Sequence, residues 1–95
     1  MKRRTLQQLR EENLARLKSL FPDLTWTVRI HRGRHQMLAS YTHRGAACGF
    51  AVGLEGTDEA ARAAGRERIA FAILLKYDPR PGDKVQLPDG TFAKA

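Results

Sequence analysis

Cysteine, proline and long hydrophobic runs are all scarce in this sequence, and each scarcity excludes a class of protein. The single cysteine, Cys48, has no partner for a disulfide within the chain, which is typical of a reducing compartment. The longest apolar run, residues 69–75, is far shorter than the roughly 20 residues that span a membrane. Residues 1–20 lack the continuous apolar segment of a signal peptide. We therefore expect a cytoplasmic protein without a membrane partner.

Prolines and glycines are also few, at four and eight among 95 residues, which excludes a low-complexity chain. The hydrophobic fraction is 42% and the charged fraction 28%, both ordinary for a globular protein. A chain of this length buries one modest core. The composition therefore predicts one small domain over residues 1–78, with residues 79–95 as a C-terminal hairpin or tail packed on it.

Acidic residues are scarce in the first half of the chain, and the net charge of the whole is +7. Residues 1–20 hold six basic and two acidic side chains, and residues 21–54 hold four arginines, all three histidines and one acid. An excess confined to one half indicates a cationic face that attracts phosphate backbones or an acidic protein surface. The alternative is a solvated surface that only keeps the protein soluble.

The spacing of apolar residues predicts a helix that begins at Thr5 and ends before Pro22. Thr5 and Gln8 form a capping-box pattern, in which each side chain satisfies a backbone N–H of the other residue. Leucines then recur at steps of three and four residues as far as Leu20. Proline disfavours helical geometry at the residue before it, so we expect the helix to end at Phe21.

Three strands are predicted next. Apolar residues alternate from Leu24 to Ile30, which is typical of a strand with one buried face, and we expect that face to meet the first helix. Glycine turns at 32–34 and 44–45 delimit a second strand, residues 37–42, whose alternation does not say which face Leu38 takes. In the third strand, residues 47–54, bulky side chains alternate with glycine and alanine. We interpret the bare face as closely packed, with a flat exposed platform as the alternative.

A second helix follows, with Thr57 as its expected N-cap and acidic residues in its first turn, and it extends to about Tyr77. Its segment 69–75 is apolar on almost every side, which indicates burial on two faces or a homodimer contact. The order of elements predicts an α+β fold. We expect a two-layer sandwich of helix, three-stranded antiparallel sheet and helix, with a short C-terminal hairpin or tail.

Catalytic and metal-binding patterns are weak. The three histidines, His31, His35 and His43, lack the further ligands and supporting groups that a metal site needs. Cys48 alternates with bulky residues and should point into the core, where a thiol is a poor nucleophile. No phosphate-binding loop, serine elbow or carboxylate pair is present. We therefore expect no enzyme activity and no cofactor.

Basic side chains provide the candidate binding site. Arginine offers forked donors that suit phosphate oxygens, and a projecting loop enters a groove that a flat sheet cannot. The histidines add positive charge under mildly acidic conditions. The residues expected to bind nucleic acid or a protein partner are Lys2, Arg3, Arg4, Arg10, Arg29, His31, Arg32, Arg34, His35 and Arg44.

With Gly33 and His35 in the first strand loop and an alanine-rich second helix, the order of elements over residues 5–77 resembles the double-stranded RNA-binding domain. The resemblance implies an α-β-β-β-α fold whose first helix and first strand loop touch successive minor grooves. In that family, lysines at the start of the second helix reach the intervening phosphates. This chain has Thr57, Asp58 and Glu59 there. The resemblance therefore predicts the fold of this chain, but it does not predict double-stranded RNA as the ligand.

The sequence thus leads to two hypotheses about function. The first is a small non-enzymatic module that binds DNA or RNA through its basic N-terminal helix and strand loops, with sequence-tolerant phosphate contacts. The alternative is a small phage-type accessory or inhibitor protein that presents the same surface to an acidic protein of a nucleic-acid-processing or defence machinery. Either would act as a monomer or a homodimer.

Overall fold

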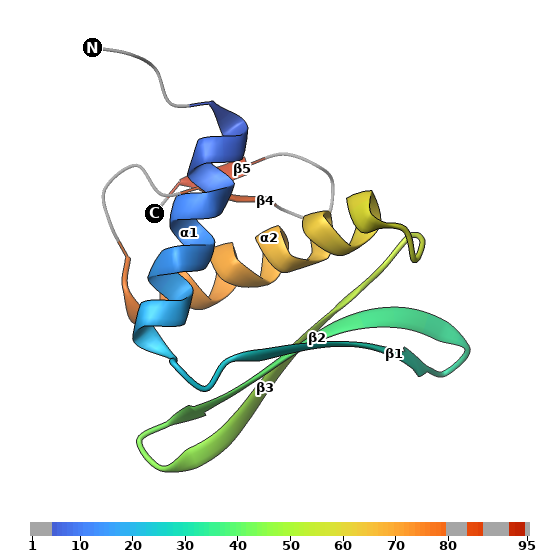
Figure 1. Ribbon diagram of the computed structural model, residues 1–95, viewed down its shortest axis with the longest axis horizontal. Helices are drawn as coiled ribbons and strands as arrows, with labels where there is room; N and C mark the ends of the chain where they lie inside the picture. The colour runs from blue at the N-terminus through green and yellow to red at the C-terminus, as the bar shows by residue number, and fades with distance from the viewer. Residues whose placement is uncertain (1–4, 80–83, 87–91, 95) are drawn as a thin grey trace.

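The computed structural model describes residues 5–79, 84–86 and 92–94. Its elements, in chain order, are α1 (Leu6–Leu20), β1 (Thr25–His31), β2 (Arg34–His43), β3 (Ala46–Gly53), α2 (Glu59–Tyr77), β4 (Lys84–Gln86) and β5 (Phe92–Lys94). Both helices lie on one face of the sheet formed by β1, β2 and β3, and together they are called the helical layer (Figure 1). The predicted α+β fold with two layers is confirmed.

The sheet is antiparallel, with β2 in the centre. Met37, Ala39 and Tyr41 of β2 are buried beneath the helical layer. Because side chains alternate along a strand, Leu38 faces the other way, onto the side of the sheet that no described helix covers. We call this side the open face. The direction of Leu38, which the sequence leaves undecided, is thereby settled.

The small residues of β3 lie on the open face and are exposed, including Gly49 and Gly53. The interpretation of a closely packed bare face is therefore wrong, and the alternative of a flat platform is correct. A Cβ added at Gly49 would meet only the Leu38 side chain at 3.6 Å and the Ala39 carbonyl oxygen at 3.7 Å, both ordinary contacts. Small residues are present there without being required by a close neighbour.

The helix termini follow the capping chemistry of their sequences. At α1, the Gln8 N–H donates to the Thr5 hydroxyl at 3.1 Å and the Thr5 N–H donates to the Gln8 side chain at 2.8 Å, which confirms the predicted capping box. At α2, the N-cap is Asp58 and the prediction of Thr57 is wrong. The Asp58 carboxylate accepts from the Ala61 N–H at 2.8 Å. Both a hydroxyl and a carboxylate can accept the capping hydrogen bond, but only the carboxylate adds a negative charge that interacts favourably with the helix dipole.

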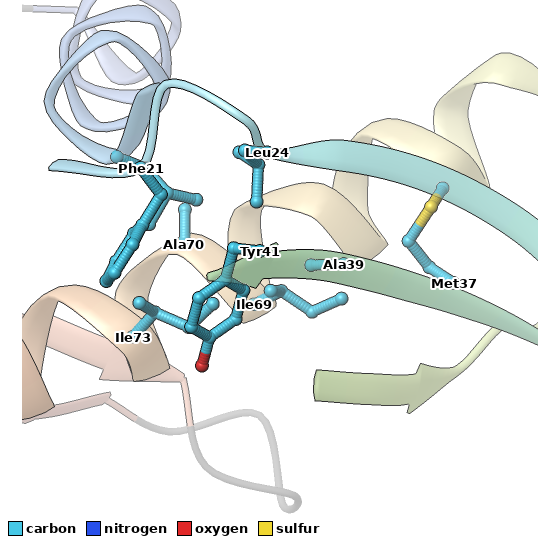
Figure 2. Close-up of a cluster of buried hydrophobic side chains, with 9 residues drawn as sticks. Phe21, Leu24, Met37, Ala39, Tyr41, Ile69, Ala70 and Ile73 are labelled. Carbon is cyan, nitrogen blue, oxygen red and sulfur yellow. The ribbon is translucent and has the colours of Figure 1, made fainter. Parts of the chain in front are cut away.

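The core lies between α2 and the sheet, and α1 closes one end of it (Figure 2). α2 contacts β2 and β3, whereas α1 packs mainly against α2. The expectation that the apolar face of β1 would meet α1 is therefore wrong: Trp26 and Val28 are only partly buried and Ile30 is 68% exposed. The residues that build the core are Leu17, Phe21, Leu24, Met37, Ala39, Tyr41, Ile69, Ala70 and Ile73.

Gly65 allows α2 to lie close to the sheet. A Cβ at this position would stand 2.7 Å from a methyl of Leu54 and 3.2 Å from the Cβ of Met37. The apolar segment 69–75 follows, and its residues Ile69, Ala70, Ile73 and Leu74 are buried. Burial within the chain thus accounts for most of that segment.

The strands near the C-terminus, β4 and β5, pair with each other antiparallel and form a separate two-stranded sheet. β4 contacts α2, and in Figure 1 the pair stands on the far side of α2 from the main sheet. Neither helix of the described chain is long and apolar enough to cross a membrane.

Candidate cationic hairpin

β1 and β2 are joined by the shortest turn that a hairpin allows. His31 pairs with Arg34, so only Arg32 and Gly33 lie between the strands. Both have positive φ, 52° and 76°. This is the geometry of a type I′ turn, whose twist matches that of the paired strands. The strands therefore stay paired up to the tip, and the tip is a rigid projection of the sheet.

The turn between β2 and β3 repeats this arrangement. His43 pairs with Ala46, and Arg44 and Gly45 have φ values of 51° and 81°. Both turns thus have the sequence His-Arg-Gly with arginine in left-handed geometry. A side chain in this geometry costs roughly 1 kcal/mol, and the position usually holds asparagine, aspartate or glycine. The chain therefore places an arginine at each tip against its conformational preference.

Five of the predicted site residues lie together at the first of these tips, which we call the cationic hairpin, residues 29–35. Their side chains are all exposed: Arg29, His31, Arg32, Arg34 and His35. By strand alternation, Arg29, His31 and Arg34 lie on the open face, and His35 lies on the other face with Ile30. Arg29 Nε donates to the Gln36 side-chain oxygen at 3.2 Å, which holds this guanidinium on the open face.

No carboxylate offsets these charges within the sheet. Residues 24–54 contain no aspartate and no glutamate, so the sheet carries four arginines and no acid. Ion pairs are found instead among residues of α1, α2 and its C-cap. They include Arg10 with Glu67 at 2.7 Å, Arg16 with Asp78 at 3.1 Å, and Arg66 with Glu59. Several arginines of the helical layer are therefore paired with acids, whereas the sheet offers its arginines no acid.

The other predicted site residues do not join the cationic hairpin. Arg10 is held by Glu67 between the two helices. Arg44 occupies the second tip, and the ten residues of β2 separate the two tips by about 30 Å at ~3.3 Å per residue. Lys2, Arg3 and Arg4 lie outside the described residues. The structure thus gathers half of the predicted set, and on the hairpin alone.

An aromatic cluster, which sequence reasoning missed, holds the second tip against the helical layer. It comprises Phe21, Tyr41, His43 and Tyr77, with ring centroids 4.5 Å apart for Phe21 and Tyr41 and again for His43 and Tyr77. Burial, and then the hydrogen bond with Tyr77, raises the pKa of Tyr41 to about 12. These rings come from three separate segments, the end of α1, β2 and the end of α2, so no local pattern could reveal the cluster. It anchors the Arg44 tip, whereas Ile30 within the cationic hairpin is mostly exposed.

The start of α2 has acidic surroundings. Asp58 caps the helix, and Glu59 pairs with Arg66. Both acidic residues are exposed. In the double-stranded RNA-binding domain, lysines at this position reach phosphates, and the charge found here would repel them. The helix-strand-strand-strand-helix order is compatible with that family, while this part of its binding surface has the opposite charge.

The remaining candidates of the sequence are separated in space. His31, at the end of β1, and His35 lie beside the first turn, and His43 lies at the other end of β2. No three His, Cys, Asp or Glu side chains gather into a metal site within residues 5–79. Cys48 is half-buried against the core, with its sulfur 3.6 Å from the Ala46 carbonyl oxygen. No protein-family model, curated protein or solved structure matches this chain.

Proposed function

We propose that this protein binds nucleic acid by inserting the cationic hairpin into a groove of a duplex and contacting phosphates on both sides of it. The observation that carries the proposal is the concentration of Arg29, Arg32 and Arg34 on one rigid projection of a sheet that contains no carboxylate. Phosphate contacts of this kind fix position without reading sequence. The protein therefore binds many sequences with similar affinity.

The open face next to the hairpin supports a duplex as the ligand. Apart from Gln36, its polar side chains beyond the hairpin are hydroxyls, from Thr25, Thr27, Ser40 and Thr42, and hydroxyls are suited to hydrogen-bond phosphate oxygens. Its described residues include no phenylalanine, tyrosine or tryptophan on which an unpaired base could stack, and the imidazole of His31 lies at the hairpin tip. Proteins that bind single strands without sequence preference use such stacking. The chemistry of this face thus favours backbone contacts over base contacts.

The test measures binding of fluorescently labelled duplex DNA, duplex RNA and single-stranded DNA by anisotropy over a range of salt concentrations. We expect duplexes to bind more tightly than the single strand. The triple variant R29Q/R32N/R34Q should lose at least about tenfold in affinity. The slope of log K against log salt concentration should become less negative by about 3, since each of the three lost phosphate contacts contributes roughly 0.9 to this slope.

The matched control is R62Q, which removes one exposed charge from α2. It should leave both the affinity and the salt slope nearly unchanged. Equal losses in R62Q and in the single variant R34Q would show that binding follows net charge alone, contrary to the proposal. Absence of duplex binding at low salt would also contradict it.

The alternative function uses the same surface against an acidic protein, as a small accessory or inhibitor protein would. Its support is also the uncompensated sheet, because guanidinium groups pair with carboxylates as readily as with phosphates. An immobilised wild-type protein and the triple variant, exposed to a cell lysate treated with nuclease, distinguish the two. A protein retained only by the wild type, combined with no duplex binding, favours the alternative.

A further inference from the structure

Within the part of the chain that the structure describes, β3 is an edge strand without the usual protection against pairing with another strand. Natural edges are blunted by charged side chains, prolines, bulges or a covering segment. Residues 46–53 contain no charge and no proline, although the chain as a whole carries +7. Their pairing with β2 is continuous and has no bulge. The neutral composition of this strand is thus unlike that of the rest of the sheet.

The hydrogen bonds show which backbone groups of β3 have no partner among the described residues. The Leu54 N–H donates to the His35 carbonyl at 2.9 Å, so Leu54 and every second residue before it direct their backbone groups toward β2. Residues 47, 49, 51 and 53 therefore direct theirs away from the sheet. Among these, the Gly53 carbonyl accepts a hydrogen bond from the guanidinium of Arg68 on α2.

The unpaired part of the edge is therefore short and has defined ends. One end is the turn at Gly45, and the other is Gly53, where Arg68 occupies the carbonyl. Between them, Ala47, Gly49 and Ala51 present their N–H and C=O groups outward. Gly49 is the midpoint of this segment.

We propose that a second copy of this chain pairs here, β3 against β3 in antiparallel orientation, with a two-fold axis at Gly49. In this register Gly49 pairs with Gly49 of the second copy, and Ala47 pairs with Ala51. All the outward N–H and C=O groups of these residues are then satisfied on both copies. A two-fold axis brings the same segment of both copies together, so the segment must be complementary to itself. Residues 47–51 meet this requirement, because Gly49 meets Gly49 and each Ala47 meets an Ala51.

Side chains on the two faces of the joined sheet fit this register. On the face toward the helical layer, Phe50 stands opposite Cys48 of the second copy, as a closely spaced pair without mutual hydrogen bonds. Phe50 is 37% exposed in the single chain, so this contact covers apolar area that the chain leaves open. On the other face, alanine and glycine meet alanine and glycine. No charge opposes another across the interface.

The same geometry limits assembly to two chains. The outer edges of the joined sheet are the two β1 strands, and each carries Arg29 and His31. Cationic side chains on an edge disfavour further strand addition. The two cationic hairpins lie at opposite ends of the joined sheet, because the strands of the two copies run antiparallel. Their mutual repulsion is therefore small.

The first test compares G49P with G49A by sedimentation equilibrium over a series of protein concentrations. The Gly49 N–H points away from β2, so proline removes a bond of the proposed interface and none of the sheet within one chain. Alanine fits with ordinary contacts. We expect the wild type and G49A to form dimers and G49P to dimerise at least about tenfold more weakly.

The second test uses charge at the two-fold axis. G49K and G49D each place like charges directly opposite each other, so each alone should be monomeric. An equimolar mixture should form a heterodimer, which a merely misfolded variant would not. A monomeric wild type at every concentration, a G49P variant that dimerises like G49A, or a mixture that stays monomeric would each overturn the proposal, as would assembly beyond a dimer.

Discussion

One guanidinium nitrogen of Arg16 on α1 donates hydrogen bonds both to the main-chain carbonyl of Asp78, at 2.8 Å, and to its carboxylate, at 3.1 Å. Asp78 is the C-cap of α2, so this contact joins the second half of one helix to the end of the other. The Arg16 side chain is only 16% exposed. The contact is therefore shielded from water more than a surface ion pair is.

Replacing Arg16 should lower the stability of the protein. R16A removes hydrogen bonds to a charged group and to a carbonyl, and we expect the free energy of unfolding to fall by about 2 kcal/mol. R16K keeps the charge but loses the forked geometry, and should cost about half as much. Urea unfolding measures both. R62A, which changes an exposed arginine of α2, is the control, and an equal loss there would contradict the assignment.

Replacing the turn arginine should separate stability from binding. Arg32 has φ of 52°, where asparagine is better tolerated, so R32N should raise the free energy of unfolding by about 0.5–1 kcal/mol. The same variant removes one cationic group from the hairpin and should weaken duplex binding. R34N, in regular strand geometry, should weaken binding without any gain in stability. Thermal unfolding of both variants checks the first point, and a destabilised R32N would refute it.

Stability should decline at alkaline pH through Tyr41. Its pKa is raised to about 12 in the folded protein from an ordinary value of 10.0. The unfolded chain therefore releases this proton first, and stability falls between about pH 10 and pH 12 by at most ~1.4 kcal/mol per pH unit from this group. In Y41F this contribution is absent, so its free energy of unfolding should depend less steeply on pH over that range. Parallel curves for the two proteins would contradict the prediction.

Gly65 should resist substitution although it lies inside a helix. Alanine is favoured over glycine in helices by about 1 kcal/mol, but its Cβ would stand 2.7 Å from Leu54 and 3.2 Å from the Met37 Cβ. The Met37 Cβ is fixed to the central strand and cannot yield easily. We therefore expect G65A to lose about 1 kcal/mol net in urea unfolding, within the usual cost of overpacking. In the L54A background, which removes the closer clash, the loss should shrink.

Local patterns were sufficient for most of the secondary structure. The capping box of Thr5 and Gln8 and the two Arg-Gly turns depend only on neighbouring residues, and each is present where the sequence places it. The N-cap of α2 shows the limit of this reasoning. Thr57 and Asp58 are both good caps, and the choice depends on the backbone geometry that precedes the helix.

Contacts between distant residues could not be predicted. Arg10 and Glu67 form an ion pair between the two helices, and the sequence of neither helix indicates which residue of the other helix it contacts. The same holds for Phe21 and Tyr77, whose rings meet at 5.4 Å. The face of the sheet that Leu38 takes could not be predicted for a related reason. It stands on the open face of a central strand, where an apolar residue looks like a core residue until the layers are known.

The lack of carboxylates in the sheet has a consequence at long range. Because the four arginines of residues 24–54 have no acid among them, whereas α1 and α2 carry both basic and acidic side chains, the sheet is the more strongly positive of the two described layers. In the field of a polyanion, this difference favours an approach in which the strands lead. The helices then trail outward, and their surface stays accessible to a third molecule.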